Sequence, residues 1–300
     1  MLCLDNINTT FFIFSDVVPH LLYYSHLPAM LLSFLFGFFI YFKSNRSLLG
    51  KILFFLSISF SLWVLLNLII WTNSSSSLII FLWSLTGFLY AFICVIALYF
   101  AYVYIDKRDI DFKKKIIFAL LLLPTIILIP TNFNLERFDL SNCEAMEGTY
   151  FTNYYYGLGF IVFVWIIALT IARYRHVEYE NRKQILLLTV GLGFFLVSFF
   201  ISGYLASYFG NFELEQYGLF GMIFFMGVLG YMIVRFEAFH IKILGTQALV
   251  VTLFILIAAQ FAFIQNSTNR VLNLIALVLI TGFGYILIRS VKREVAQREA

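Results

Sequence analysis

The chain alternates between long apolar runs and short polar stretches along its whole length. An uninterrupted apolar run of about 18 residues is long enough to cross the hydrocarbon core of a bilayer as a helix. Nine runs of this kind can be delimited, and each is expected to form a membrane span. Their predicted bounds are Leu21–Phe42, Ile52–Trp71, Leu78–Ile105, Ile116–Pro130, Gly157–Ala172, Ile185–Phe209, Gly218–Val234, Leu244–Ile264 and Val271–Ile288.

Composition indicates the same class of protein. Hydrophobic residues make up 62% of the chain and charged residues 12%, whereas a soluble domain carries about 25% charged residues. A membrane β-barrel would show short segments in which apolar and polar residues alternate, and the sequence contains no such alternation. We therefore expect an all-α polytopic membrane helical bundle, with a seven-helix module and two further transmembrane helices. The predicted order is an extracytoplasmic head (1–20), a seven-transmembrane module (21–243), two additional transmembrane helices (244–288) and a cytoplasmic connector helix (289–300).

The distribution of basic residues predicts the orientation. With the N-terminus outside, all of the 20 Lys and Arg residues except Arg137 and Arg270 lie in inner loops. This is the bias that cytoplasmic loops of membrane proteins show. If the short span Ile116–Pro130 did not cross, the basic residues would be divided equally between the two sides. Nine crossings with a cytoplasmic C-terminus are therefore predicted, and the net charge of +4 indicates no nucleic-acid partner.

The predicted spans contain no Asp, Glu, Lys or Arg. Proteins that move ions commonly keep such residues within the membrane despite their cost, so an ion or proton transporter is disfavoured. The chain also lacks the His-Glu-x-x-His and Gly-x-Ser-x-Gly motifs, and neither an enzyme activity nor a metal or cofactor is predicted. The four histidines are expected at surfaces or interfaces. The Gly-Leu-Gly sequences at 157–159 and 191–193 are expected to allow close helix packing.

Neutral polar residues within the spans are the remaining candidates for a site. Trp63 and Asn67 lie four residues apart and share a helix face, and Trp83 lies on the third span. We take these three as candidate ligand-binding residues, although such side chains more often pack helices together. A buried amide such as that of Asn67 needs hydrogen-bond partners. Aromatic residues near span ends, including Tyr154–Tyr156, are interpreted as anchors at the membrane interface. The sequence does not decide whether Cys3 and Cys143 form a disulfide.

The stretch Tyr231–Ile243 brings charge back between two long apolar runs. It resembles the Tyr-Ala-Ile-Val-Arg-Tyr-Arg-Leu-Phe-Asp-Ile type of segment that follows the seventh span in the sensor region of bacterial and archaeal membrane histidine kinases. The matching residues are Tyr231, Ile233, Val234, Arg235, Phe239 and Ile241; Glu237 and His240 depart from the pattern. The resemblance implies a prokaryotic plasma membrane and signal-coupling roles for Tyr231, Arg235 and Phe239.

The resemblance implies a sensory signal-transduction module of a two-component receptor. The chain holds no phosphoacceptor histidine box or ATP-binding domain, so a cytoplasmic kinase core is expected in cis or in trans. Its signal would leave through the charged tail Arg289–Ala300, whose residues all tolerate a helix. Other expected partners are the lipid bilayer, a small-molecule or membrane signal, and a second copy of the chain. The alternative is a transporter or permease for a neutral or lipidic substrate, which would need a continuous polar path and repeated halves.

Overall fold

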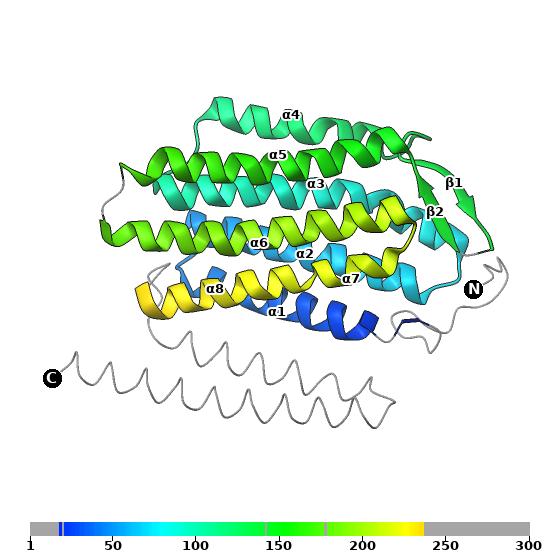
Figure 1. Cartoon of the computed structure of the whole chain (residues 1–300), viewed down its shortest axis with the longest axis horizontal. Coiled ribbons are helices and arrows are strands. Elements are labelled where there is room, and N and C mark those ends of the chain that lie inside the picture. Colours follow the sequence, from blue (N-terminus) through cyan, green and yellow to red (C-terminus); the bar gives the residue numbers. More distant parts are fainter. Residues whose placement is uncertain (1–17, 20, 142, 177–178, 237–300) are drawn as a thin grey trace, which may run out of the picture.

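A computed structural model shows a bundle of long helices that lie side by side (Figure 1). It describes residues 18–236 except 20, 142, 177 and 178. The long helices are α1 (Leu21–Lys43), α2 (Leu48–Thr72), α3 (Ser76–Asp106), α4 (Phe112–Leu128), α5 (Thr149–Tyr174), α6 (Tyr179–Phe209) and α8 (Phe220–Phe236). Between α4 and α5 lie strands β1 (Leu135–Asp139) and β2 (Glu144–Glu147), and before α8 lie η1 (Phe212–Leu214) and α7 (Glu215–Gly218).

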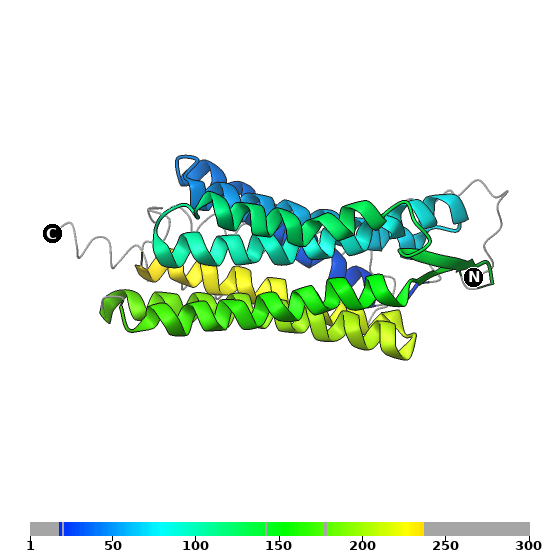
Figure 2. The same cartoon turned by 90° about the horizontal axis from the view of Figure 1, so that it is seen from above.

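Successive long helices run in opposite directions along the bundle, as Figures 1 and 2 show. Six helical segments are long and apolar enough to cross a membrane, the last being Phe212–Ile233. Helix α4 has 17 residues and runs antiparallel to α3 and α5 (Figure 1). The predicted all-α polytopic bundle is confirmed, and the chain is a multi-pass membrane protein. The predicted helices at 244–288, the connector at 289–300 and residues 1–17 of the head lie outside the described residues.

Helix α3 is the centre of the bundle. It packs against α2, α4, α5 and α6, and most of its residues are buried. Its 31 residues correspond to a length of about 46 Å, more than the roughly 30 Å of a hydrocarbon core. Helix α4 is peripheral by comparison, because Phe118 and Thr125 are its only buried residues. Large apolar side chains such as Phe81, Leu120 and Phe160 are exposed on the outside, where a bilayer would solvate them.

Strands β1 and β2 form an antiparallel hairpin with Asp139 opposite Glu144. This hairpin lies beyond the ends of α3 and α5 (Figure 1), and we call that end of the bundle the hairpin end. Cys143, at the start of the hairpin's second half, is disulfide-bonded, whereas Cys94 is a free buried thiol; Cys3 lies outside the described residues. Helix α5 begins at Thr149 rather than at the predicted Gly157.

Aromatic rings in edge-on and stacked contacts fill the middle of the bundle. They connect α2, α3, α6 and α8 through successive contacts with centroid distances of 4.8–6.2 Å. Most of these rings are fully buried, so they leave little room for water. We call this set the aromatic column, and it consists of Trp63, Tyr90, Phe199, Phe60, Phe195, Phe225 and Phe100.

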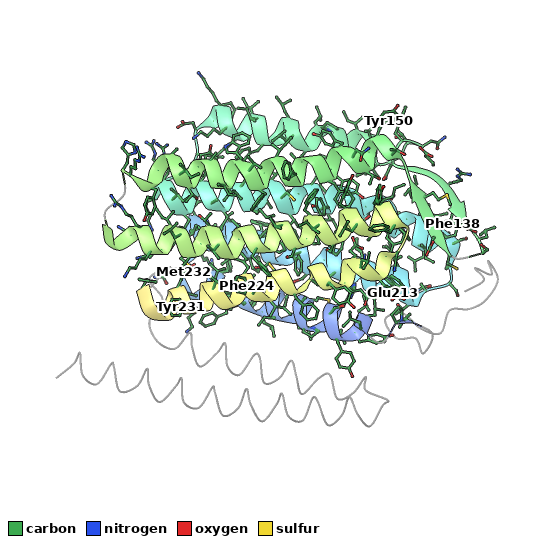
Figure 3. All side chains as sticks on the ribbon, viewed as in Figure 1. Phe138, Tyr150, Glu213, Phe224, Tyr231 and Met232 are labelled. Atoms are coloured by element: carbon green, nitrogen blue, oxygen red, sulfur yellow. The ribbon has the colours of Figure 1, made fainter. Side chains whose placement is uncertain are left out.

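The end of the bundle away from the hairpin carries most of the charge. The two ion pairs of the described residues, Arg173–Asp106 at 2.9 Å and Lys115–Asp109 at 2.6 Å, both lie there. Hydrogen bonds from Lys115 and Tyr99 hold the pKa of Asp109 below its ordinary value. Tyr231 lies at this end of α8 (Figure 3) and is exposed. Of the other two predicted coupling residues, the side chain of Arg235 and all of Phe239 lie outside the described part.

Candidate functional site

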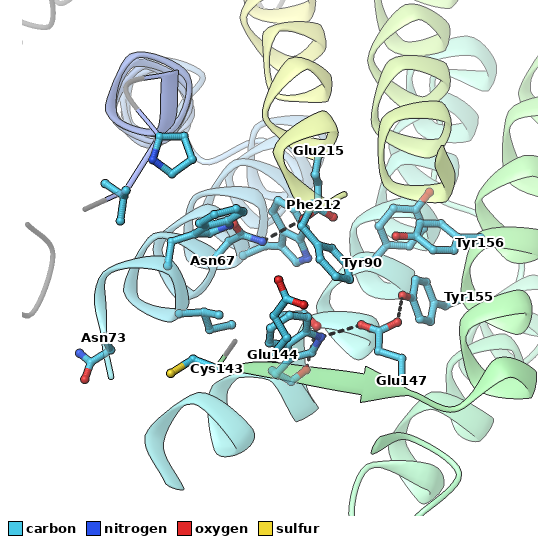
Figure 4. Close-up of a pocket in the computed structure, with 18 residues that line it drawn as sticks. Asn67, Asn73, Tyr90, Cys143, Glu144, Glu147, Tyr155, Tyr156, Phe212 and Glu215 are labelled. Carbon is cyan, nitrogen blue, oxygen red and sulfur yellow. Dashed lines mark hydrogen bonds between the residues drawn. The ribbon is translucent and has the colours of Figure 1, made fainter. Parts of the chain in front are cut away.

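A cavity of about 210 Å³ opens among the helix ends at the hairpin end of the bundle (Figure 4). Its walls come from α2, α3, α5, the β1–β2 hairpin and the η1–α7 segment. All three predicted ligand-binding residues, Trp63, Asn67 and Trp83, lie on these walls. The full lining consists of Val18, Pro19, Trp63, Asn67, Ile70, Trp71, Asn73, Trp83, Thr86, Gly87, Tyr90, Cys143, Glu144, Glu147, Tyr155, Tyr156, Phe212 and Glu215.

Helical periodicity explains why α3 contributes so many of these residues. Trp83, Thr86, Gly87 and Tyr90 are spaced by three, four and seven residues from the first, so they share one face of the helix. On α2, Trp63 and Asn67 are spaced by four for the same reason. The two faces point toward each other across the cavity. The sequence analysis used this spacing for α2 alone; on α3 it named Trp83 without Gly87 or Tyr90.

Glu147 joins α3, α5 and the hairpin on one side of the cavity. Its Oε1 accepts a hydrogen bond of 2.8 Å from the indole Nε1 of Trp83. Its Oε2 accepts one of 2.9 Å from the hydroxyl of Thr152 and a short one from the hydroxyl of Tyr155. Both oxygens thus accept hydrogen bonds from neutral donors. Figure 4 shows two of these bonds.

Glu215 occupies the other side of the cavity, at the start of α7. Its Oε2 accepts a hydrogen bond of 3.1 Å from Nδ2 of Asn67. The Oδ1 of Asn67 lies 3.0 Å from Nε2 of His26. In this arrangement Nε2 must carry a proton, because the amide oxygen can only accept. A chain of three side chains thus connects α7, α2 and α1, and the expectation that Asn67 needs partners is confirmed.

Three expectations from the sequence are wrong at this site. His26 is not a surface or interfacial residue, because it is 1% exposed. Tyr155 and Tyr156 are not interface anchors, because α5 begins earlier than predicted and turns both rings into the cavity wall. Glu215 does not belong to a solvated loop; it lies in the apolar segment Phe212–Ile233. The spans are therefore not free of acidic residues.

Glu144 completes the acidic lining from the first residue of β2. Its carboxylate makes no hydrogen bond or ion pair with any residue that the structure describes. Partial burial, and then the nearby Asp139 carboxylate, raise its pKa above the ordinary value. Loss of water is the larger cause, as expected for a partly buried carboxylate.

The cavity is closed on the side that faces the middle of the bundle. The ring of Phe199 stacks on Tyr90 with centroids 4.8 Å apart and meets Trp63 edge-on at 4.8 Å. Close approach of α5 to α3 completes this floor, since a Cβ atom on Gly159 would lie 2.6 Å from the hydroxyl of Tyr90. The aromatic column begins directly at the floor.

Among the described residues, no three His, Cys, Asp or Glu side chains are grouped as a metal site would require. Acidic, aromatic and amide groups line the cavity, and concave sites with a few polar groups among aromatic walls are typical of small-molecule binding. Comparison of the chain with protein-family models, curated proteins and solved structures gives no match.

Proposed function

We propose that the chain is a membrane sensor module that binds a small molecule in this cavity and passes the bound state along the bundle. The observation that supports this best is the shape of the site. The floor of the cavity rests on the aromatic column. A carrier needs a polar route through the bilayer, and the column offers none in the described part of the bundle. A closed site coupled to a packed core suits detection better than transport.

We also propose that the hairpin end faces outward. Of the basic residues described, Arg137 is the one at the hairpin end, while the turns at the other end hold many Lys and Arg residues. Cytoplasmic loops are enriched in such residues. The disulfide at Cys143 supports the same orientation, because disulfides persist in oxidising compartments. The cavity would then receive its ligand from outside the cell.

The output would leave through α8 and the residues that follow it. The aromatic column connects the cavity floor to Phe225 on α8 by direct ring contacts. Helix α8 leads into Tyr231–Ile243, the stretch that resembles the closing segment of histidine-kinase sensor regions. We propose a cytoplasmic kinase core, in cis or in trans, as the receiver of the signal and a dimer as the working form.

The test is to fuse the chain after Ala300 to a histidine-kinase core and to fill the cavity by substitution. Thr86→Trp places a large ring in the cavity, because Thr86 is buried on its wall. Phe88→Trp is the matched control, since Phe88 lies on the same helix outside the cavity. We expect Thr86→Trp to change autophosphorylation at least threefold and Phe88→Trp to leave it unchanged.

Thermal unfolding of both variants shows whether each is folded. Thr86→Leu, a smaller filling substitution, replaces Thr86→Trp if the larger ring prevents folding. A folded, cavity-filled fusion with the same autophosphorylation as the control would refute the sensor function.

A further inference from the structure

The cavity walls carry acidic side chains and no basic ones. Glu144, Glu147 and Glu215 all line the cavity, and no Lys, Arg or His is among its lining residues. Both ion pairs of the described residues lie at the far end of the bundle. A partly enclosed group of acids costs free energy unless a positive charge accompanies it.

The three carboxylates differ in how many hydrogen bonds they accept from the protein. Glu147 is held by Trp83, Thr152 and Tyr155 through both oxygens, so its place is structural. Glu215 uses Oε2 for Asn67, and its Oε1 makes no hydrogen bond with a described residue. Glu144 makes none at all. Glu215 and Glu144 are therefore the two acids with oxygen atoms available to a ligand.

A buried hydroxyl on the wall is also without a partner. Tyr90 lines the cavity and is 3% exposed. Its hydroxyl has the thiol of Cys94 nearby but forms no hydrogen bond of normal geometry with a described residue. Buried hydroxyls are almost always hydrogen-bonded to protein or to a bound molecule. This unsatisfied group is an observation separate from the acids, and it also indicates that something polar binds here.

Aromatic rings make up much of the remaining wall. The rings are those of Trp63, Trp71, Trp83, Tyr90, Tyr155, Tyr156 and Phe212. Trp83 and Phe212 are in direct edge-on contact, with centroids 5.4 Å apart. Ring faces attract cations and especially alkylated ammonium groups. Rings and carboxylates together form a site that suits an ammonium group with an apolar body.

From these observations we propose that the cavity binds a small organic cation, an amine or quaternary ammonium compound, with its charge beside Glu215 and Glu144. A metal ion is a poorer fit, because the described acids do not converge on one point and the cavity, at about 210 Å³, is far larger than an ion. This inference rests on the proposed sensor function and names its ligand class. The cation would lie one hydrogen bond from Asn67, and so one side chain from His26 on α1.

Choline and its uncharged isostere 3,3-dimethylbutan-1-ol are the matched probes. Three of the four tryptophans line the cavity, so intrinsic fluorescence reports binding to the full chain in phosphatidylglycerol nanodiscs. We expect choline to bind at least tenfold more tightly than the isostere. Adding phosphatidylcholine to the nanodiscs identifies the source, since competition indicates a lipid headgroup and its absence indicates a free solute.

Charge-removing variants locate the cation. Glu215→Gln keeps the shape of the side chain, and we expect it to weaken choline binding by about tenfold or more, the usual effect of losing a charged partner. Glu213→Gln is the matched control, because Glu213 is an exposed acid two residues away. Glu144→Gln, with exposed Glu136→Gln as its control, provides the same comparison on the hairpin if Glu215→Gln does not fold.

Equal binding of choline and its isostere, or unchanged choline binding in both Glu215→Gln and Glu144→Gln, would overturn the cation site. The kinase fusion separates this failure from that of the proposed function. If filling the cavity changes autophosphorylation but no ammonium compound binds, the ligand class is wrong and the sensor function stands. If choline binds but neither it nor the filling substitution changes autophosphorylation, the site stands and the sensor function is wrong.

Discussion

At the scale of single residues, Asn67 shows how far the sequence can be used. Its place in an apolar run predicts a buried amide, and a buried amide predicts hydrogen-bond partners. The identity of those partners could not be predicted, because His26 and Glu215 lie 41 and 148 residues away along the chain. The sequence predicted His26 at a surface or interface and Glu215 in the connection between the sixth and seventh spans. Three-dimensional packing alone brings them together.

The Asn67 link leads to a prediction about stability. Asn67→Leu keeps the volume of the side chain but leaves His26 Nε2 and Glu215 Oε2 without this partner. We expect it to destabilise the protein by about 1–3 kcal/mol, the cost of leaving a buried polar group unsatisfied. Ser59→Ala on the same helix is the control, because its hydroxyl bonds only to the carbonyl of Phe55 one turn earlier.

Unfolding of both variants in the same detergent measures the difference. Equal stability of Asn67→Leu and Ser59→Ala would show that the link between α1, α2 and α7 contributes nothing.

The acids of the cavity were missed for a residue-scale reason. Hydropathy assigns Glu147 and Glu215 to polar segments between spans, and such segments are normally solvated. Both fold back between helix ends because neutral donors compensate their burial: Trp83, Thr152 and Tyr155 for one, Asn67 for the other. The sequence does contain a signal, since Glu147 is followed at intervals of five and eight by a hydroxyl and a phenol. That signal has meaning only once α5 is known to begin at Thr149.

At the scale of elements, the two glycines of Gly157-Leu-Gly159 on α5 behave differently. Close packing was predicted for both, and it is confirmed for Gly159 alone. A Cβ atom there would lie 2.6 Å from the Tyr90 hydroxyl, whereas nothing lies within 4 Å of one on Gly157. The two positions are two residues apart and so point to different sides of the helix. Periodicity alone could have separated them, had the buried face of α5 been known.

This difference gives a matched pair of substitutions. We expect Gly157→Ala to stabilise the protein by about 0.5–1 kcal/mol, because alanine favours the helix over the unfolded chain and meets no neighbour. We expect Gly159→Ala to destabilise it by about 1–3 kcal/mol, the usual cost of overpacking, because the Tyr90 ring must move. Gly159→Ala should also weaken binding in the cavity, whose floor contains Tyr90.

Thermal unfolding of the two variants decides between the contacts. If Gly159→Ala is as stable as Gly157→Ala, the close contact between α3 and α5 is not a determinant of the fold.

At the scale of the whole molecule, the helical bundle could be predicted and the cavity could not. Six of the described segments are long and apolar enough to cross a membrane. Helix α4 is not among them, and the last two predicted spans lie outside the described residues. Crossings follow from the apolar length of each run, which is a local property of the sequence. The cavity requires α2, α3, α5, α7 and the hairpin to meet at one end, and no hairpin was predicted between the spans Ile116–Pro130 and Gly157–Ala172. Trp63, Asn67 and Trp83 could be predicted because each is a neutral side chain with a polar group inside an apolar run. Residues from the connections were not.

The orientation of the whole bundle yields the last prediction. Exposed Glu136 on the hairpin and exposed Lys113 at the start of α4 mark the two ends. In intact bacterial cells a membrane-impermeant maleimide should label Glu136→Cys and leave Lys113→Cys unlabelled until the cells are permeabilised. The unmodified chain is the control, because its free thiol at Cys94 is buried. Labelling of Lys113→Cys alone would place the cavity on the cytoplasmic side. The signal would then have to come from inside the cell, and neither the disulfide nor the basic turns would indicate the orientation.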